Sequence, residues 1–552
     1  MASDAMRSRS LFSSTRFLLF AIAGIAALSF FPFLGNTHLF DWDEINFAES
    51  AREMLVTGDF LRVRINFEPF WEKPPLFFWM QALAMQVMGV NEWAARFPNA
   101  LFGIITLLTL FLIGKREKDL TFGLFWTFFY AASFLPHLYF RSGIIDPIFN
   151  YFIFLGVYFL YKTVSADSKS ISTSAFAGIA TGLSILTKGP VGFLLVLLTF
   201  TVLWISRKIT NKIAHYQEVV VFAFSTFLVS FLWFGWETIQ NGPWYLVEFI
   251  QYQIALFSQP VAGHDQPWYY HAVVIFVGCF PASIFGLTQL FQFKSTKDLD
   301  RWMLVLFWVV LLLFSYVTTK IVHYSSMTYL PLSYLAAKEL HHWHEFRSIK
   351  KWVLWLFGVL GSLWALLFGI TTYVLNRPAW LTTWVKGSFA KASLTVSVDL
   401  SGWEWMIGIL LFCAVLAFIY LINKRRYFGA VIIYTLSVSL SLTLFAGYVL
   451  PAIESFSQGP AIEFFESHQQ ESAYLMTEGH KSYAPYFYGR VEPYENPNAK
   501  DKKWLLTGPI DRPVYIAVKV NKAERMAQYP DIIKLHAKGG FVFYRRDPVM
   551  IE

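Results

Sequence analysis

The chain has 552 residues, of which 56% are hydrophobic, 19% aromatic and only 15% charged, and its mean hydropathy is +0.45. Soluble domains carry about 25% charged residues, so this composition excludes an ordinary soluble protein and indicates many membrane-spanning helices. The net charge of +8 does not indicate nucleic-acid binding, because the basic residues lie in short segments between apolar runs. The two cysteines, Cys279 and Cys413, lie inside apolar runs and suggest neither a disulfide framework nor a cysteine metal site.

The first apolar run, residues 17–35, follows a basic N-terminal segment and resembles a signal peptide. It is long, and no small-x-small cleavage pattern follows it, so we predict an uncleaved membrane helix. Twelve further runs are long enough to cross a bilayer, which predicts thirteen spans in all. These runs are 94–114, 120–140, 147–161, 171–186, 189–206, 218–236, 269–290, 302–317, 321–338, 352–374, 402–422 and 428–449.

The apolar segment 76–90 decides on which side every later loop lies. It has only 15 residues, whereas a span needs about 20. If it lies along the membrane surface, one side holds 21 Lys and Arg in 72 residues, over segments 1–16, 115–119, 161–170, 207–217, 291–301, 338–351 and 423–427. The other side then holds 10 in 132, over 36–93, 141–146, 187–190, 237–268, 318–322 and 375–401. The positive-inside rule therefore favours an interfacial helix within a first periplasmic loop, 36–93.

The composition changes after Pro451, where the long apolar runs end. Residues 451–552 alternate short strand-like runs such as PVYIAVKV with polar helical stretches, which predicts a small α/β domain. Thirteen crossings from a cytoplasmic start place it on the periplasmic side. The predicted fold is thus a mostly α, polytopic membrane domain (1–450) with a soluble periplasmic α/β domain (451–552).

The densest ionisable cluster follows the first span. Asp43 and Glu44 begin a predicted helix, and Glu72 and Lys73 precede two prolines that fix an extended turn. Charges near a bilayer are costly and are usually retained because they bind something charged. Helix capping and a local ion pair are the structural alternatives. In the functional interpretation a carboxylate accepts a proton or holds a metal, and Lys73 binds a phosphate.

Two later sites place charges beside apolar stretches. Arg141 and Asp146 flank four residues without charge, either as an ion pair or as parts of an outer pocket. Lys188 lies beside a Gly-Pro break at the tip of a predicted helical hairpin. There it either extends harmlessly to the interface or binds a lipid phosphate at headgroup depth.

Further candidates lie in two other outer loops. Lys320 and Tyr324 repeat the arrangement of Lys188 between two later spans, and His264 with Asp265 ends an aromatic-rich loop. His264 has a structural role and a metal or acceptor contact as its two alternatives. The predicted set is catalytic Asp43, Glu44 and Asp146, phosphate-binding Lys73, Lys188, Arg141, Lys320 and Tyr324, and metal-binding Glu72 and His264. All of these except Tyr324, which lies in the predicted span 321–338, fall on the outer side in the predicted topology. Neither a P-loop nor a Rossmann glycine motif is present, so no nucleotide cofactor is expected.

Three motifs carry a family resemblance. They are Asp-Glu-x-x-x-Ala-Glu-x-Ala-Arg-Glu-Met-Leu-x-x-Gly-Asp (43–59), Glu-Lys-Pro-Pro (72–75) and Asn-Glu-Trp-Ala-Ala-Arg (91–96). This pattern resembles the ArnT/PMT-like GT-C glycosyltransferases, most closely the bacterial aminoarabinose (lipid A) transferase branch. The resemblance extends through 141–146, Leu-Thr-Lys-Gly (186–189) and 320–324, and so covers most of the membrane part.

The resemblance implies a polyprenyl-phosphate sugar donor, undecaprenyl phosphate in bacteria, and an inverting transfer on the outer face of the bacterial inner membrane. It implies Asp43 as the key carboxylate, Glu72 near a divalent metal or the acceptor, and Lys73 and Lys188 on the donor phosphate. The acceptor is lipid A, a protein hydroxyl or an envelope glycan, and we expect a monomer.

Three departures from the aminoarabinose branch bear on donor and acceptor. Asn46 and Phe47 replace an Arg and a Tyr common after Asp-Glu, and Phe70 replaces a Tyr common before Glu-Lys. A protein O-glycosyltransferase of the same superfamily is therefore an alternative. A lipid or sugar transporter and a membrane scaffold are others, but transporters often contain internal repeats and we find none.

Overall fold

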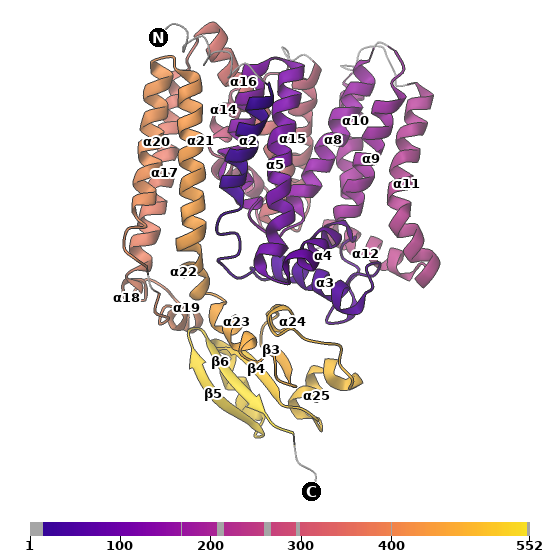
Figure 1. Ribbon diagram of the computed structural model, residues 1–552, viewed down its shortest axis with the longest axis vertical. Coiled ribbons are helices and arrows are strands. Elements are labelled where there is room, and N and C mark those ends of the chain that lie inside the picture. The colour runs from indigo at the N-terminus through magenta and orange to yellow at the C-terminus, as the bar shows by residue number, and fades with distance from the viewer. Residues whose placement is uncertain are drawn as a thin grey trace.

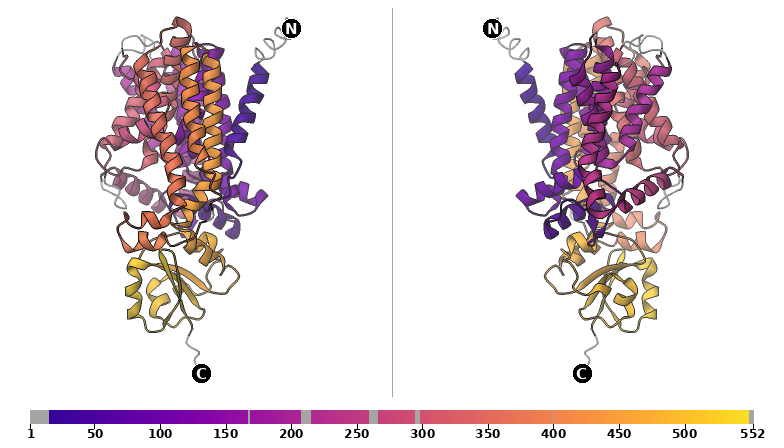
Figure 2. Two further views of the ribbon diagram at one scale, coloured as in Figure 1. Left: turned by 90° about the vertical axis from the view of Figure 1, so that its left-hand side faces the viewer. Right: turned by 90° about the vertical axis from the view of Figure 1, so that its right-hand side faces the viewer.

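The structure is a computed structural model that describes residues 15–166, 168–206, 215–258, 266–293, 298–398 and 400–548. Its helices form an elongated bundle, and a small domain containing the C-terminal strands extends from one end of it (Figures 1 and 2). Helices α3, α4 and α12 lie across that same end, between the bundle and the small domain (Figure 1). The three parts meet there, and this end holds the cavity described below.

Each predicted span contains at least one helix, but the count of thirteen crossings is not confirmed. Among the described residues, seven helices are long and apolar enough to cross a membrane. They are α5 (Glu92–Glu117), α8 (Asp146–Ser165), α11 (Tyr216–Asn241), α15 (Asp298–Tyr316), α17 (Lys351–Leu375), α20 (Met406–Asn423) and the continuous stretch Tyr427–Ser455, which comprises α21 (Tyr427–Leu444), η3 (Phe445–Val449) and α22 (Leu450–Ser455).

The other predicted spans are shorter, interrupted or less apolar. They are α2 (Thr15–Phe30), α6 (Leu120–Ala131) with α7 (Phe134–Tyr139), α9 (Ile171–Lys188), α10 (Val191–Ile205), α13 (Tyr270–Gly278) with α14 (Ala282–Leu287), and η2 (Val322–Thr328) with α16 (Tyr329–Phe346). Pro281 separates α13 from α14, because proline has no amide hydrogen to continue the helical ladder.

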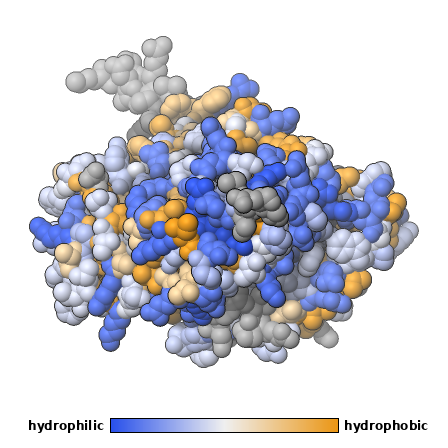
Figure 3. All heavy atoms as spheres, turned by 90° about the horizontal axis from the view of Figure 1, so that it is seen from below, coloured by the Kyte–Doolittle hydropathy of each residue, from blue (hydrophilic) through white to orange (hydrophobic). Residues whose placement is uncertain are grey.

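The outward faces of the bundle are apolar. Most of the apolar stretch of α11 faces outward, since only 17% of it is buried. Phe224 and Leu232 on this helix are 60% and 67% exposed. Such a large apolar surface is stable only in contact with lipid, so the chain is a multi-pass membrane protein. The end of the molecule that carries the small domain is instead largely hydrophilic (Figure 3).

The first loop folds as α3 (Asp43–Thr57), a hairpin of β1 (Arg64–Ile65) and β2 (Glu68–Pro69), and α4 (Leu76–Met88). α3 ends at Gly58, whose φ of 68° is the left-handed conformation that glycine adopts without strain. α4 has 13 residues, about 20 Å of helix, too short for a hydrocarbon core of about 30 Å. Its position across the end of the bundle confirms the prediction of an interfacial helix (Figure 1).

The C-terminal region forms the predicted α/β domain. Its four-stranded sheet has the order β3-β4-β6-β5, with β3 and β4 parallel and the other two pairings antiparallel. The strands are β3 (Tyr474–Glu478), β4 (Val514–Lys519), β5 (Ile532–Lys538) and β6 (Phe541–Arg546). The short helices of this end are α12 (Trp244–Ser258), α18 (Pro378–Leu381), α19 (Ser388–Ser393), α23 (Gly459–Glu466), α24 (Ala484–Tyr488), η4 (Pro497–Lys500), α25 (Lys502–Thr507) and η5 (Val520–Gln528). The proposed domain boundary at residue 450 stays a prediction, and it falls inside a continuous helix.

Candidate active site at the membrane end

A cavity of about 690 Å³ lies between the bundle, the first loop and the C-terminal domain. Segments far apart in sequence build it: the first loop, the start of α8, the hairpin of α9 and α10, α12, the segment from α15 to η2, and the C-terminal domain. Its ionisable lining side chains are Asp41, Asp43, Glu44, Glu72, Lys73, Asp146, Lys188, Tyr252, His323, Tyr324, Lys481 and Tyr483. Seven of the ten predicted site residues therefore line one cavity: Asp43, Glu44, Glu72, Lys73, Asp146, Lys188 and Tyr324.

The two acidic residues that begin α3 have different environments. Asp43 is 45% exposed and faces His323, with 3.8 Å between its Oδ2 and Nε2 of His323. Glu44 is buried and accepts two hydrogen bonds from Arg96, at 2.9 and 3.0 Å, and others from the amides of Phe40 and Gly143. Burial alone would raise the pKa of Glu44, but Arg96 and these amides outweigh it and lower the pKa. Both oxygens of Glu44 are thus engaged in holding the first loop, whereas Asp43 is available to a ligand.

Arg141, which we predicted to bind donor phosphate, does not line the cavity. Its guanidinium is buried and donates to the backbone carbonyls of Ser29 and Pro32, at 2.6 and 2.5 Å. It does not pair with Asp146 either. The geometry gives Arg141 a structural position at the end of the first span, where it satisfies carbonyls that the helix leaves without partners.

Asp146 instead pairs with Lys188, and these two predicted residues stand at the centre of the cavity wall. Lys188 Nζ lies 2.5 Å from Asp146 Oδ1, and Asp146 Oδ2 lies 3.9 Å from His323 Nε2. Lys188 also lies over the ring of Tyr324, 5.1 Å from its centroid. His323 also lies close to Asp43. The side chains of Lys188, Asp146, His323 and Asp43 are therefore neighbours in that order along the cavity.

Glu72 and Lys73, which come later in the first loop, also line the cavity. Glu72 Oε2 accepts a hydrogen bond from the Tyr252 hydroxyl at 2.9 Å, and Lys73 Nζ lies 5.4 Å from the centroid of the Tyr252 ring. No ion pair of Lys73 within 4.0 Å is found among the described residues. Burial lowers the pKa of Lys73 and Lys188 lowers it further, although Glu72, Asp43 and Asp146 act in the opposite direction. A partly buried ammonium without an ion-pair partner is stabilised by an anion placed beside it.

The remaining predicted residues lie elsewhere. Lys320 is buried and does not line the cavity. His264 lies outside the described residues. Within the described part of the chain, Glu72 belongs to no group of three His, Cys, Asp or Glu side chains close enough to hold a metal. A metal held by Glu72 and His264 stays a prediction, and we derive no step through one.

The sequence reasoning did not assign a role to His323, Tyr252, Lys481 or Tyr483. His323 and Tyr252 could have been found from the motif 320–324 and the aromatic-rich loop before His264. The two C-terminal residues carried no signal. Lys481 accepts a hydrogen bond on its carbonyl from Trp42 Nε1 at 3.0 Å, and the amide of Tyr483 donates to Asp41 at 3.3 Å. The C-terminal domain thus closes one side of the cavity.

Comparisons with known proteins agree with this architecture. A family model described as "Dolichyl-phosphate-mannose-protein mannosyltransferase" matches residues 72–233. An uncharacterized protein of Aquifex aeolicus is 29% identical over 342 residues, 61% of this chain and 65% of the relative. Undecaprenyl phosphate-alpha-4-amino-4-deoxy-L-arabinose arabinosyl transferase 2 of Pseudomonas fluorescens is 26% identical over 385 residues, 66% of this chain and 67% of the relative. The chain thus matches about two thirds of the length of these relatives.

Among solved structures, ArnT from Cupriavidus metallidurans bound to undecaprenyl phosphate superimposes with a TM-score of 0.76 at 15% identity, over 96% of this chain and 98% of that one. At this identity the likeness shows a shared fold, and it extends over both the bundle and the C-terminal domain. The chain therefore shares the fold of ArnT, and its sequence matches and the motifs around the cavity are similar to those of the ArnT/PMT-like GT-C transferases.

Proposed function

We propose that the chain is a membrane glycosyltransferase that moves a sugar from a polyprenyl phosphate, undecaprenyl phosphate in bacteria, to a cell-envelope acceptor of the lipid A type. One observation carries this proposal: the cavity combines a partly buried cation, Lys73, which has no ion pair within 4.0 Å among the described residues, with a half-exposed carboxylate, Asp43, at the end of a membrane bundle. The name of the Pseudomonas fluorescens relative and the undecaprenyl phosphate bound to the Cupriavidus protein support the choice of donor.

The donor phosphate is proposed to bind between Lys73 and Lys188. A phosphate would supply the counter-charge that Lys73 lacks among the described residues, and the lipid headgroup depth matches the membrane end of the bundle. Lys188 already pairs with Asp146, so its contact with phosphate would be shared. As the leaving phosphate gains negative charge, the fixed cations stabilise the transition state more than the bound donor.

The transfer itself is an inverting displacement. An acceptor oxygen forms a bond to the anomeric carbon while the bond from that carbon to the donor phosphate oxygen breaks, and polyprenyl phosphate leaves with the electron pair. When the acceptor is a hydroxyl, its proton passes to Asp43. When the acceptor is a phosphate, its oxygen is already anionic and Asp43 orients rather than deprotonates. Asp146 holds His323 beside Asp43 in either case.

We propose that the cavity opens on the periplasmic face of the bacterial inner membrane and that the enzyme works as a monomer. The bias of 21 Lys and Arg in 72 residues on one side against 10 in 132 on the other supports this orientation. The C-terminal domain and the cavity then share the periplasmic side, because both lie at one end of the bundle (Figure 1).

Protein O-glycosylation is the second candidate function. The family model matched by residues 72–233 is named for a protein mannosyltransferase. Asn46, Phe47 and Phe70 line the cavity and depart from the aminoarabinose pattern. An apolar wall at Phe47 and Phe70 would offer fewer hydrogen bonds to a sugar than the tyrosines of that branch, which bears on the donor sugar.

The test uses the full-length protein in detergent with two donor and acceptor pairs: undecaprenyl phosphate-aminoarabinose with lipid A, and polyprenyl phosphate-mannose with a Ser/Thr-rich peptide. We expect transfer with the first pair, detected by mass spectrometry, and its loss in Asp43→Asn but not in Asp531→Asn, an exposed residue of the C-terminal domain. Transfer only to the peptide would favour the second candidate. Absence of transfer from every polyprenyl-phosphate sugar, with no binding of undecaprenyl phosphate, would overturn the proposal and favour a transporter or scaffold.

A further inference from the structure

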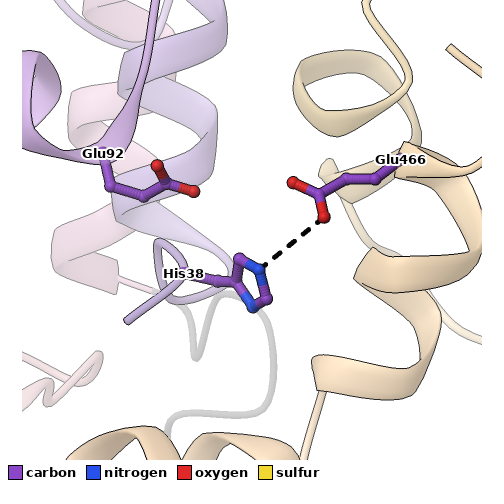
Figure 4. Close-up of side chains that lie close together, drawn as sticks. All are labelled: His38, Glu92 and Glu466. Atoms are coloured by element: carbon purple, nitrogen blue, oxygen red, sulfur yellow. Dashed lines mark ion pairs between the residues drawn. The ribbon is translucent and has the colours of Figure 1, made fainter. Parts of the chain in front are cut away.

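A second cluster of ionisable side chains lies at the junction between the membrane part and the C-terminal region, and it does not line the cavity. It consists of His38, which precedes α3, Glu92 at the start of α5, and Glu466 at the end of α23 (Figure 4). One nitrogen or oxygen atom from each of the three lies within 4.8 Å of the others. Three separate segments therefore converge on one point, and two of them belong to the membrane part.

The two nitrogens of His38 face different carboxylates. Nε2 lies 3.9 Å from Oε2 of Glu466, the contact drawn in Figure 4, whereas Nδ1 lies 3.2 Å from Oε2 of Glu454 in α22. If Nδ1–H donates to Glu454, the lone pair of Nε2, which faces Glu466, is available to a metal ion. A histidine that binds a metal almost always has its second nitrogen fixed in this way by a carboxylate.

Glu454 gives a second, independent indication that this cluster can bind a cation. Its side chain is only 5% exposed, and its Oε1 has no hydrogen-bond partner in the described part of the chain. A buried carboxylate is costly unless a cation or several donors compensate it. His38 is the one basic side chain found within 4.0 Å of Glu454 among the described residues, and it is shared with Glu466.

The neighbouring arginines do not neutralise the cluster. Arg96 donates to Glu44 through Nε and Nη2, and its terminal nitrogens also donate to backbone carbonyls that include that of His38. Arg490 donates to the carbonyl of Val90 and forms no ion pair within 4.0 Å in the part of the chain that the structure describes. Three carboxylates thus surround one imidazole, and the negative charge is in excess.

The segment carrying His38 is also fixed in advance. Arg96 Nη2 donates to the His38 carbonyl at 3.0 Å, and Gln458 donates to the Leu39 carbonyl at 2.7 Å. At the same time His38 and Glu466 keep 26% and 38% of their side-chain surface exposed, so an ion can reach them from solvent. The cluster is therefore both held in place and accessible.

We propose that His38 Nε2, Glu92 and Glu466 bind a first-row divalent cation of the Zn²⁺ type, with Glu454 supporting His38 from behind, and that this ion fastens the C-terminal domain to the membrane part. One imidazole and carboxylates are ligands that Zn²⁺ accepts, with a fourth position left for water. Tetrahedral Zn²⁺ ligands lie about 3.3 Å apart, so the 3.9 Å between His38 Nε2 and Glu466 Oε2 requires only a small closure.

The test measures metal content and thermal unfolding of the tag-free, full-length protein in detergent. The protein is stripped with EDTA, dialysed against low micromolar Zn²⁺, and compared with His38→Gln and Glu466→Gln. The matched control is Glu463→Gln, because Glu463 lies in the same helix but is 52% exposed and pairs with Lys538. Sugar transfer is not the readout, so the result does not depend on the proposed function.

We expect about one Zn²⁺ per chain in the unmodified protein and in Glu463→Gln, with a rise in unfolding temperature on adding Zn²⁺. Both should be lost in His38→Gln and Glu466→Gln. If the unmodified protein retains no Zn²⁺, or if the two variants retain it equally, the proposal is wrong and the cluster is an ordinary histidine–carboxylate contact. Should His38→Gln not fold, Glu466→Gln decides, since Glu466 is the more exposed of the two.

Discussion

Two groups of charged residues lie side by side at the membrane end of the bundle, and they differ in how completely their charges are paired. In the first group, Glu44 at the cavity wall and Arg96 and Arg141 behind it are buried and engaged by each other or by backbone carbonyls. In the cavity, Asp43 is 45% exposed and Lys73 has no ion pair among the described residues. Residue type and closeness in sequence do not separate these groups, because Asp43 and Glu44 are adjacent. The two groups differ in whether a charged side chain that faces the cavity still lacks a partner for its charge or hydrogen bonds.

The strongest test of this difference is Asp43→Asn. The asparagine keeps the shape but cannot accept a proton, so we expect the rate of transfer to a hydroxyl acceptor to fall by about 10²–10⁴-fold. Asp43 is half-exposed and the change should leave the unfolding temperature nearly unchanged. Rates of transfer to a hydroxyl acceptor and thermal unfolding are measured on the same preparation, with Asp531→Asn as control. Full activity of Asp43→Asn would remove Asp43 from the proposed chemistry.

Glu44→Gln should show the opposite behaviour. It leaves Arg96 buried without its counter-charge. Removing one partner of a buried ion pair lowers the free energy of unfolding by about 3–5 kcal/mol. We therefore expect a clear fall in unfolding temperature and poor yield, with activity per folded molecule largely retained. A stable Glu44→Gln protein that has lost transfer would reverse the assignment of the two acidic residues.

The two lysines of the cavity should also differ. Lys73→Ala removes the unpaired cation, and we expect affinity for undecaprenyl phosphate to fall about 10–100-fold without loss of stability. Lys188→Ala should weaken binding as well, but it also leaves Asp146 buried without its partner and should destabilise the protein. Binding is measured by titration in detergent, with Lys503→Ala in the C-terminal domain as control. Equal stability loss in both variants would contradict the distinction.

The smallest expected effect concerns pH. Burial raises the pKa of Asp41 to about 6, although hydrogen bonds from Ser482 and the amide of Tyr483 oppose it. A raised pKa in the folded protein means that this stabilisation is complete below the ordinary value near 3.8 and is lost as the pH rises through 6. We expect Asp41→Asn to gain up to about 2 kcal/mol relative to the unmodified protein between pH 4 and 7. Parallel curves of unfolding temperature against pH for the two proteins would count against it.

Much of the fold followed from apolar run lengths and charge bias, since both reflect the cost of polar groups in lipid. The interfacial helix α4 and the α/β domain after residue 451 were predicted on this basis. The count of thirteen crossings stays a prediction, because Pro281 and other interruptions shorten helices within what the sequence shows as one apolar run. The hydropathy of an apolar run is a sum over its residues, so it does not show where a helix within the run is interrupted.

The site was predictable where charges interrupt apolar sequence, as at Lys73, Asp146 and Lys188, all of which line the cavity. It was not predictable which charges pair. Arg141 is five residues from Asp146 in sequence, yet Asp146 pairs with Lys188, and Arg141 binds carbonyls of the first span. Lys481 and Tyr483 were missed because nothing local in the C-terminal domain distinguishes them from surface residues.

The helix from Tyr427 to Ser455 continues from the membrane into the C-terminal domain without a loop. A rod of this kind transmits the tilt of the span to whatever is attached at its far end. Lys481 and Tyr483 of that domain line the cavity, so this helix links a membrane span directly to the domain that forms one wall of the site.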